Sequence, residues 1–411
     1  MILGCIGDDF TGSSDLGLTL AEGGMRTIQY CGVPDRPAEE GVDAGIVALK
    51  TRTAPKDRAV ADSLAALRWL RDQGCRQFFF KICSTFDSTR EGNIGPVLDA
   101  LVEELKSDAP VIICPAFPAN GRTVFQGHLF VGDRLISESG MAHHPLTPMT
   151  DPDIRRWLSY QTRRGVGHLP LAALKRDAVA ALRAERDAGR PFVIADAVSD
   201  DDLRALGSAS EGLPLLCGGS GLALGLPGVL GTSDRAGAWR GEAGPVLILS
   251  GSCSQATRAQ VKHHVQAGHP AFKLDIDSVM QDRTTPQAMV AAALAAGPLP
   301  LVYSSDDPAE VEAMQARYGR EPLADALDRF FGDMAAEAAE RGVRRIVCAG
   351  GETSGAIVQA LGAASLEIGP AIDPGVPMVR VAGRPLVLAL KSGNFGAPDF
   401  FARAATMLES R

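Results

Sequence analysis

The chain begins with MILGCIGDDFTGSSD (residues 1–15), an apolar run that ends in a glycine, two acids and several small hydroxyl residues. Residues 2–6 predict a buried β-strand, and the hydroxyl residues after Asp9 predict the start of a helix. A strand that passes directly into a helix begins a β-α-β unit, in which strands pair in parallel and helices cover the sheet. Asp8 and Asp9 then lie at the carboxyl end of a strand, where open α/β sheets bind ligands. Plain capping of the helix by the same side chains is the alternative interpretation.

Apolar runs and amphipathic segments alternate through the remainder of the 411 residues. Further strands are predicted at 77–82, 111–114, 192–195, 246–249, 299–303, 345–348 and 386–390. The small, polar, glycine-rich stretch 231–244 predicts a linker between a domain at 1–230 and a domain at 245–411. We expect an α/β fold of two domains, each a mostly parallel sheet flanked by helices, with the active site in the cleft between them. The last helix-like stretch, 399–408, can pack on either domain.

Composition and charge limit the class of protein. Hydrophobic residues make up 45% and charged residues 22% of the chain, as in ordinary globular proteins with sizeable cores. The net charge of −8 disfavours a general nucleic-acid binder, so an anionic ligand must be held by local cations, helix N-termini or a metal. Prolines interrupt the long charge-free stretches, and the start lacks a signal-peptide pattern, so we expect a soluble cytoplasmic protein without membrane contact. The eight cysteines lack zinc-site spacing and are expected to be reduced thiols.

Several common motifs are absent from the sequence. It contains no Walker A loop, no G-x-G-x-x-G dinucleotide fingerprint, no H-E-x-x-H and no G-x-S-x-G. These absences disfavour a standard P-loop protein, a dehydrogenase, a metalloprotease and an α/β-hydrolase.

Two more loops in the front half follow predicted strands and carry groups suited to an acidic sugar. The loop after strand 77–82 supplies a cation, hydroxyl groups and an acid: Lys81, Ser84, Asp87 and Ser88. A lysine there supplies a point charge for a carboxylate. In the loop after strand 111–114, Arg122 can hold a carboxylate through two parallel hydrogen bonds. For the loop after 77–82, an ordinary solvated loop is the alternative.

Small-residue loops follow predicted strands in the back half, at 250–254, 350–355 and 391–396. The first two open helices. Without bulky side chains the backbone can approach a phosphate, and a helix N-terminus offers free N–H donors and partial positive charge. Two such loops in one domain indicate a mononucleotide pocket, in which Lys391 can meet a phosphate.

Together these segments resemble the four-carbon acid sugar kinase family over nearly the whole chain. DDFTG at 8–12, KICSTFDST at 81–89 and GRT at 121–123 are similar to its acid-sugar domain. SGSCS at 250–254, GGETS at 350–354 and LKSGNFG at 390–396 are similar to its nucleotide domain. FDST at 86–89 and HPLTPMTD at 144–151 favour the 3-oxo-tetronate 4-kinase branch over threonate or erythronate kinases.

The resemblance implies that the γ-phosphoryl group of ATP is transferred to the terminal (C4) hydroxyl of a four-carbon oxo acid, in acid-sugar catabolism. It places the ATP contacts on Ser250, Ser252, Gly350, Gly351, Glu352, Thr353 and Gly393. Asp9 or Asp8 is the expected catalytic base, Lys81 and Arg122 are expected to hold the sugar carboxylate, and Asp87 is expected to bind a sugar hydroxyl.

Mg²⁺ is expected as a second cofactor, held mostly by phosphate and water rather than by protein ligands. Two alternatives remain open: a threonate or erythronate kinase of the same family, and a non-catalytic sensor of acid sugars. The expected partners are the acid sugar and ATP, without nucleic acid. The stereochemistry of the sugar, the choice between Asp8 and Asp9, the extent of domain closure and the formation of a homo-oligomer are left open by the sequence.

Overall fold

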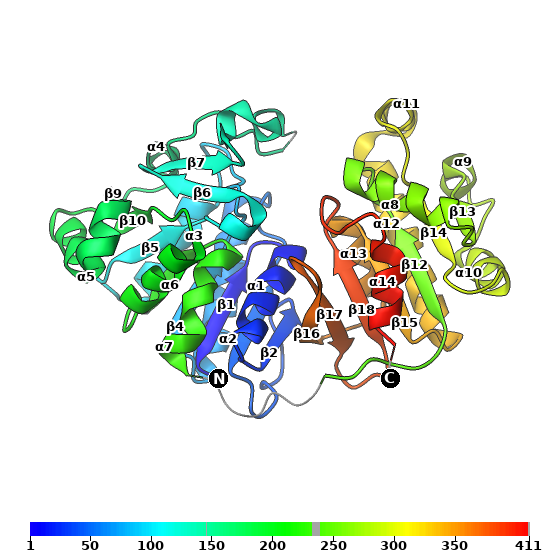
Figure 1. Cartoon of the computed structure of the whole chain (residues 1–411), viewed down its shortest axis with the longest axis horizontal. Helices are drawn as coiled ribbons and strands as arrows, with labels where there is room; N and C mark the ends of the chain where they lie inside the picture. Colours follow the sequence, from blue (N-terminus) through cyan, green and yellow to red (C-terminus); the bar gives the residue numbers. More distant parts are fainter. Residues whose placement is uncertain (145, 232–238, 410–411) are drawn as a thin grey trace. The chain divides into compact units, whose positions relative to one another are not determined.

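The computed structural model describes residues 1–144, 146–231 and 239–409. The chain divides into two compact units, Met1–Ala236 and Gly237–Arg411 (Figure 1). Each unit consists of a sheet with helices and has its own hydrophobic core, so the predicted α/β class is confirmed. Half of the predicted linker at 231–244, namely residues 232–238, lies outside the described residues.

The main sheet of the first unit is parallel throughout. Its strands lie in the order β2–β3–β1–β4–β11–β5–β10–β9, and every neighbouring pair runs in parallel. The strands are β1 (Leu3–Gly7), β2 (Thr27–Cys31), β3 (Ala44–Ala48), β4 (Gln77–Lys81), β5 (Val111–Cys114), β9 (Val166–Leu169), β10 (Phe192–Ala195) and β11 (Leu215–Gly218). Gly7 pairs with Ala48 on one side and with Lys81 on the other. The loops after β1, β3 and β4 therefore leave the sheet side by side at one edge.

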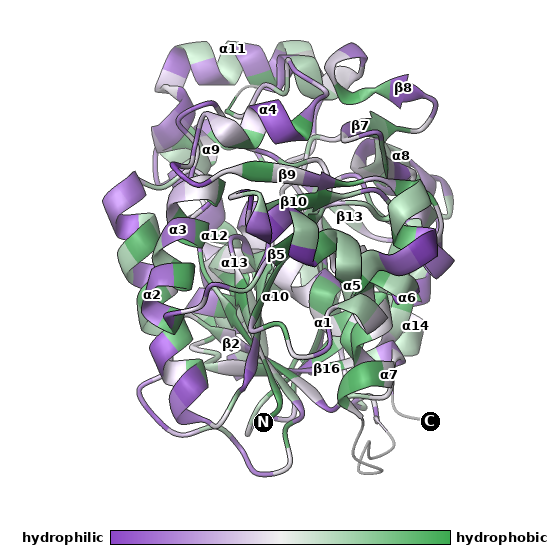
Figure 2. Ribbon diagram, turned by 90° about the vertical axis from the view of Figure 1, so that its left-hand side faces the viewer, coloured by the Kyte–Doolittle hydropathy of each residue, from purple (hydrophilic) through white to green (hydrophobic). Residues whose placement is uncertain are grey.

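Amphipathic helices cover this sheet. They are α1 (Phe10–Glu22), α2 (Lys56–Asp72), α3 (Ile94–Leu105), α4 (Ile154–Ser159), α5 (Leu171–Asp187), α6 (Asp200–Ala209) and α7 (Leu226–Leu230). Leu67 and Leu70 of α2 and Leu98 and Leu101 of α3 are fully buried, so each of these helices turns an apolar stripe towards the core. Figure 2 shows hydrophilic and hydrophobic residues alternating along α2.

A small antiparallel sheet follows β5 in the first unit. It consists of β6 (Arg122–Phe125), β7 (His128–Val131) and β8 (Arg134–Leu135). Gln126 and Gly127 form the two-residue turn between β6 and β7, with φ of 52° and 70°. Positive φ at both positions is the geometry of a type I′ turn, whose twist matches that of the strands it joins.

The sheet of the second unit is parallel except at one end. Its order is β13–β14–β12–β15–β18–β17–β16, with β17 antiparallel to both of its neighbours. The strands are β12 (Val246–Ser250), β13 (Ala271–Lys273), β14 (Leu301–Tyr303), β15 (Arg345–Ala349), β16 (Ser365–Asp373), β17 (Val376–Val381) and β18 (Val387–Lys391). Ser250 pairs with Ala349, and Ala349 pairs with Lys391, so the three small-residue loops begin next to one another.

The helices of the second unit include the last helix of the chain. They are α8 (Gln255–Gln266), α9 (Ile276–Met280), α10 (Pro286–Ala295), α11 (Pro308–Tyr318), α12 (Arg320–Glu340), α13 (Gly351–Ala360) and α14 (Phe400–Met407). Phe400, Phe401 and Ala404 of α14 are buried in one core cluster with Val246 and Val347. The terminal helix thus packs on the unit to which it is joined. No helix within the described ranges is long and apolar enough to cross a membrane.

His264 on α8 should make stability depend on pH. Its side chain is buried, its Nε2 lies 3.0 Å from Leu299 O, and it packs edge-on against Phe401. Burial, assisted by the nearby His269 and His263, lowers the pKa of His264 to about 4. The unfolded chain then binds this proton more readily than the folded chain, so stability is lost as pH falls from about 6.5 towards 4.

We predict that the thermal midpoint will fall over this pH range, and that His264→Gln will weaken the dependence because glutamine stays neutral. The measurement is thermal unfolding at several pH values. His143→Gln, at an exposed position of the first unit, is the matched control and should keep the wild-type slope. An unchanged slope in His264→Gln would show that this histidine does not carry the effect.

Candidate functional site

The loops after β1, β3 and β4 bring charged side chains together at the carboxyl edge of the first sheet. Asp8 follows β1 directly, and its backbone accepts from Thr51 N at 2.9 Å while its own N–H donates to Lys81 O at 3.1 Å. The loop at 51–54 is held in turn by Asn93, whose Nδ2 donates to Thr51 O and Ala54 O at 2.8 Å each. Main-chain hydrogen bonds therefore fix all three loops relative to one another.

Arg52 is the centre of this cluster, and sequence reasoning missed it. Its Nε and Nη2 donate to the two carboxylate oxygens of Asp8 at 3.0 and 2.8 Å, and Nη2 also donates to Asp9 Oδ1 at 2.6 Å. Its Nη1 lies 3.8 Å from Asp87 Oδ2, beyond hydrogen-bond distance. The signal that would have found Arg52 is its position four residues after β3, but that strand was not predicted.

Asp8 and Asp9 lie in different environments although they are adjacent. The side chain of Asp8 is 5% exposed and that of Asp9 is 27% exposed. Asp9 also caps α1, because its Oδ2 accepts from Gly12 N at 3.2 Å and from Thr11 Oγ1 at 3.1 Å. Capping of α1 and a partly exposed position at the carboxyl edge of the sheet therefore coexist in this carboxylate, so the cap does not exclude a role in ligand binding.

The two carboxyl groups are shifted in opposite directions. Burial raises the pKa of Asp8 above its ordinary value, and Arg52 offsets this only in part. Burial also acts on Asp9, but Arg52, Lys81 and the Gly12 amide outweigh it and hold the pKa of Asp9 below its ordinary value. Asp9 is thus the ionised, accessible carboxylate of the pair, and Asp8 is the buried one.

The loop after β4 contributes some of its predicted residues to this cluster. Lys81 is buried, and its Nζ donates to Ile82 O at 2.7 Å. The same Nζ lies next to Gly12, since a Cβ at Gly12 would be 3.0 Å from it. Asp87 accepts from Thr85 Oγ1 at 2.6 Å and faces Arg52. Burial and Asp87 raise the pKa of Cys83 to about 11, so this thiol remains protonated.

Ser84 and Ser88 have different surroundings. Ser84 is half-buried in the loop. Ser88 is buried; its hydroxyl donates to Phe86 O at 2.9 Å and lies 3.0 Å from both Trp157 Nε1 and Gln161 Nε2, which donate to it. These contacts use the Ser88 hydroxyl to attach the loop to α4 and to the residues that follow it.

Arg122 lies at the start of β6 and is not joined to the cluster. Its Nη1 donates to Asn120 O, and within the described ranges its buried Nε has no hydrogen-bond partner. No hydrogen bond or ion pair links it to Arg52, Asp8 or Asp9 in the part of the chain that the structure describes.

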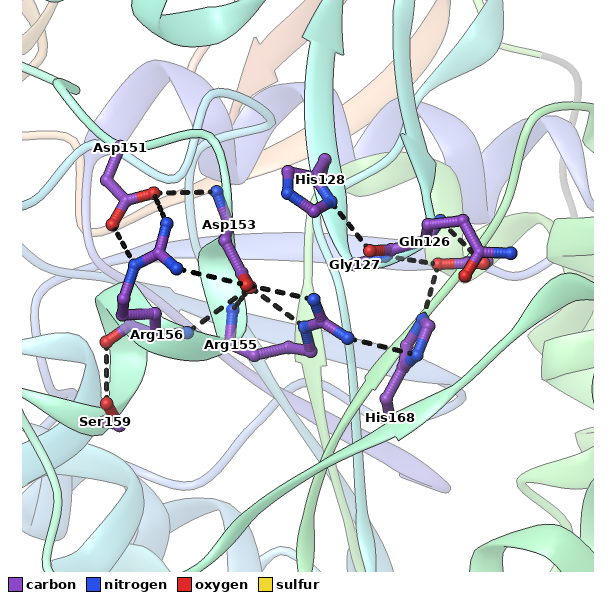
Figure 3. Close-up of polar contacts among 10 residues, drawn as sticks. Gln126, Gly127, His128, Asp151, Asp153, Arg155, Arg156, Ser159 and His168 are labelled. Carbon is purple, nitrogen blue, oxygen red and sulfur yellow. Dashed lines mark hydrogen bonds and ion pairs between the residues drawn. The ribbon is translucent and has the colours of Figure 1, made fainter.

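The turn at the end of this hairpin is anchored by a buried carboxylate, Asp196. Its two oxygens accept from Gln126 N and Gly127 N at 2.9 Å each, and from His168 Nε2 at 2.9 Å. Figure 3 shows His168 pointing towards the turn on one side and towards Arg155 on the other, with 3.4 Å between Arg155 Nη1 and His168 Nδ1. Burial acts against ionisation, but the His168 and amide donors hold the pKa of Asp196 below its ordinary value.

In the second unit, the predicted loops after β12 and β15 lie in direct contact. A side chain at Gly251 would place its Cβ 2.2 Å from Thr353 Oγ1, and one at Gly350 would place it 3.3 Å from Ser252 N. Gly350 also has φ of 136°, which side chains rarely adopt. The absence of side chains at these positions is therefore required for the two loops to approach each other.

The serines of the first loop are held by hydrogen bonds. Ser250 is buried and its Oγ lies 3.1 Å from Ser305 Oγ, which also donates to Ser252 O. Ser254 caps α8 by accepting from Thr257 N at 3.2 Å. Ser305, beyond the end of β14, was not predicted and holds the loop from the neighbouring strand.

Helix α13 begins at Gly351 without a side-chain cap, because Gly350 at its N-cap has no side chain. The N–H groups of its first turn are therefore available to an anion, and the helix dipole favours negative charge there. Thr353 is buried and donates to Asp328 Oδ1 at 3.2 Å, whereas Glu352 is exposed.

Gly393, the predicted residue of the third loop, is joined to the first loop. Its carbonyl oxygen accepts from Ser254 Oγ at 2.5 Å and from Thr257 Oγ1 at 2.8 Å. A Cβ at this position would lie 2.6 Å from Ser252 Oγ. The structure thus brings together Ser250, Ser252, Gly350, Gly351, Thr353 and Gly393 at one edge of the second sheet.

Two domain models match the chain in order. The model of a sugar-binding N-terminal domain matches residues 3–226, and that of a nucleotide-binding C-terminal domain matches residues 247–401. The acid cluster lies in the first match and the small-residue loops lie in the second.

Curated relatives match over their full length. A protein of Cupriavidus necator named 3-oxo-tetronate kinase is 51% identical, over 99% of this chain and 97% of the relative. A protein of the same name from Pseudomonas savastanoi pv. phaseolicola is 49% identical, over 99% and 97%.

Solved structures show the same fold. A Salmonella typhimurium LT2 protein, labelled a tRNA synthase, has a TM-score of 0.89 and 42% identity over 98% of both chains. A Haemophilus influenzae protein has a TM-score of 0.83 and 39% identity over 98% of this chain and 100% of its own. The chain therefore belongs to the family that joins a sugar-binding N-terminal domain to a nucleotide-binding C-terminal domain, the four-carbon acid sugar kinase family that its motifs resemble.

Proposed function

We infer that this protein is an ATP-dependent kinase that acts on 3-oxo-tetronate. The observation that carries the inference is the match, at 42–51% identity over nearly the whole chain, to several proteins named 3-oxo-tetronate kinase. The nucleotide-binding domain model supports the use of ATP. We propose that residues 1–230 bind the acid sugar, that residues 245–411 bind the nucleotide, and that the acceptor is the terminal C4 hydroxyl.

For proton transfer we propose Asp9. It is the more accessible carboxylate of the pair and is ionised, whereas Asp8 is buried and committed to Arg52. As the C4 oxygen forms its bond to the γ-phosphorus and the bond from that phosphorus to the β–γ bridging oxygen breaks, Asp9 accepts the hydroxyl proton. Phosphoryl transfer depends mainly on alignment and charge neutralisation, so a carboxylate of low pKa can still orient the attacking hydroxyl.

For substrate binding we propose a division among the cations. Arg52 has its Nε and Nη2 occupied by acids, and its Nη1 remains free to donate to a sugar oxygen. Lys81 and Arg122 would hold the carboxylate; the unpartnered Nε of Arg122 supports its part in this. Asp87 and Ser84 would bind sugar hydroxyls. The contacts of Ser88 favour a supporting role for that residue.

For the nucleotide we propose that the phosphates lie against the main chain of the loops at 250–254, 350–353 and 393, which we call the nucleotide cradle. The support is the mutual contact of these loops and the uncapped N-terminus of α13. Glu352 is exposed, so its side chain would contact the nucleotide at the solvent-facing side of the nucleotide cradle.

Mg²⁺ would be held chiefly by phosphate oxygens and water. Within residues 1–144, 146–231 and 239–409 no group of three or more His, Cys, Asp or Glu side chains is arranged to hold a metal ion. Such an ion would neutralise charge between the β- and γ-phosphates. We also propose that the two units close on their substrates to exclude water, which would otherwise compete as acceptor.

The substrate assignment predicts that 3-oxo-tetronate will be phosphorylated faster than threonate or erythronate. The measurement is a coupled ADP-release assay run side by side on the three acids, with phosphorus NMR to locate the new ester. An ester at C4 of the oxo acid is expected. Preference for a reduced acid would favour the threonate or erythronate kinase, and no turnover with any four-carbon acid would favour a non-catalytic sensor.

Asp9→Asn should lower kcat by about 10²–10⁴-fold, because an amide cannot accept the hydroxyl proton. The affinity for ADP should remain unchanged, since Asp9 lies in the other unit. Asp8→Asn should lower kcat less and should raise KM for the sugar, because it loosens Arg52. Asp72→Asn, at an exposed position on α2, is the matched control. If Asp9→Asn and Asp8→Asn both keep near-normal turnover, neither carboxylate is the base.

Arg52→Lys should reduce kcat/KM for the acid sugar by at least about tenfold, because an ammonium cannot bridge Asp8 and Asp9 as the planar fork does. Steady-state kinetics should show the loss with ADP affinity preserved. Arg58→Lys, on the exposed face of α2, should behave like the wild type. Wild-type kinetics in Arg52→Lys would show that only the positive charge at this position matters and that the guanidinium geometry does not.

Gly251→Ala should raise KM for ATP by at least about tenfold, because its Cβ would lie 2.2 Å from Thr353 Oγ1 and would push the two loops apart. KM for the sugar should not change. Gly228→Ala, where a Cβ would meet open space, is the control. Unchanged KM for ATP in a folded Gly251→Ala protein would contradict the proposed cradle.

A further inference from the structure

Lys391 is a buried cation without a carboxylate partner. It is the last residue of β18 and is completely inaccessible to solvent. Its Nζ donates to Thr257 Oγ1 at 2.9 Å, to Gly393 O at 3.1 Å and to Ser392 O at 3.2 Å. Among the described residues no Asp or Glu forms an ion pair with it. These three acceptors are neutral, so they satisfy the N–H groups but leave the charge uncompensated.

Burying a charge without a counter-ion is unfavourable, chiefly because of the free energy needed to remove the charge from water. The surrounding groups offer little compensation. The Nζ of Lys391 donates to the Thr257 hydroxyl of α8 and lies 5.9 Å from the centre of the Phe400 ring of α14. The nearby thiol is that of Cys348 on β15. Burial raises the pKa of Cys348 to about 12, so that thiol is neutral. An ammonium is retained here although a neutral side chain would fill the space at lower cost.

The contacts of Lys391 converge on a residue of the nucleotide cradle. Gly393 O accepts three hydrogen bonds, from Ser254 Oγ, Thr257 Oγ1 and Lys391 Nζ. These hydrogen bonds fix the carbonyl group and therefore the position of Gly393. A Cβ at Gly393 would lie only 2.6 Å from Ser252 Oγ, so the glycine is closely packed against the first loop. Lys391 does not present a free N–H group to a ligand; it acts through Gly393 and through its charge.

We propose that Lys391 is a positioning residue of the nucleotide site, and that the phosphate chain of the bound nucleotide is the counter-ion that its buried ammonium lacks. The proposal rests on the assignment of the 250–254, 350–353 and 393 loops to the nucleotide. It differs from a direct phosphate contact, because the lysine holds the Gly393 turn and supplies positive potential from behind it.

The proposal has a consequence for pH. In the free protein burial lowers the pKa of Lys391 to about 8. A nearby anion favours the charged form, so nucleotide binding raises this pKa and takes up a proton where the free protein has lost it. Nucleotide affinity should therefore fall as pH rises through 8. Phosphate groups have a second pKa near 6, so their own ionisation is complete in this range.

The test is isothermal titration calorimetry of the full chain with ADP and MgCl₂ between pH 6.5 and 9.5. At pH 8.5, titrations in two buffers of different ionisation enthalpy count the protons exchanged. Net uptake of a proton fraction and a progressive loss of ADP affinity above pH 8 are expected for the wild type. The sugar KM should show no matching change.

Lys391→Met should bind ADP at least about tenfold more weakly at pH 7 and should show no proton uptake at pH 8.5. Lys262→Met removes one positive charge from an exposed position on α8 and should keep both the affinity and the uptake. If Lys391 only supported the fold, Lys391→Met would have a lower thermal midpoint and the wild type would bind ADP without proton uptake at pH 8.5.

Two outcomes would overturn the proposal: wild-type ADP binding without proton uptake at pH 8.5, or a Lys391→Met protein that binds ADP with wild-type affinity and pH dependence. The wild-type measurement decides the matter even if the variant does not fold. Failure of the nucleotide assignment has a different signature. If Gly251→Ala leaves ADP affinity unchanged while Lys391→Met lowers it, the cradle is wrong and the lysine acts elsewhere.

Discussion

The guanidinium group of Arg52 holds the acid edge of the first sheet together. Asp8 is buried, the adjacent Asp9 is partly exposed and Asp87 lies close by, so their negative charges would repel one another without a shared cation. The planar guanidinium presents paired N–H donors in fixed directions to two carboxylates at once, and the compact ammonium of a lysine does not reproduce this geometry. Because the three acids and the arginine come from the loops after β1, β3 and β4, this interaction also fixes how those loops meet.

The second unit, which we propose binds the nucleotide phosphates, would have to accommodate a large negative charge instead. It would do so with main chain rather than with a cluster of cations. Gly251, Gly350 and Gly393 lack side chains at the points where neighbouring loops come closest, and the first turn of α13 is left uncapped. Among the described residues, Lys391 is the one buried cation at these loops, and its Nζ contacts the main chain of the third loop at Gly393. This arrangement would keep the main chain of these loops accessible to the phosphates that we propose bind there.

Much of this could be predicted from the sequence, and the failures have a physical explanation. Strands β4 and β5 contain consecutive large apolar side chains, Phe-Phe-Phe and Val-Ile-Ile, and the loops that follow them could be recognised for that reason. Strand β3 reads Ala-Gly-Ile-Val-Ala, and it was overlooked because small residues suffice for a strand buried on both faces of a parallel sheet. Arg52 was lost with it. The role of Ser88 in sugar binding stays a prediction, because the sequence does not show that partners far along the chain, such as Trp157, donate to its hydroxyl.

The attachment of the β6–β7 hairpin has a consequence for how this family can diversify. Asp196 grips the tip of the hairpin only through the amides of Gln126 and Gly127 and is steadied by His168. This attachment does not use the side chain of Gln126, which can therefore vary, whereas Gly127 is restricted because a Cβ there would lie 2.5 Å from Arg155 Nε. In the two arms Val124 and Leu129 are buried in the core, whereas Phe125 is exposed. The solvent-facing side chains of the hairpin are therefore the ones that can change while its tip stays attached.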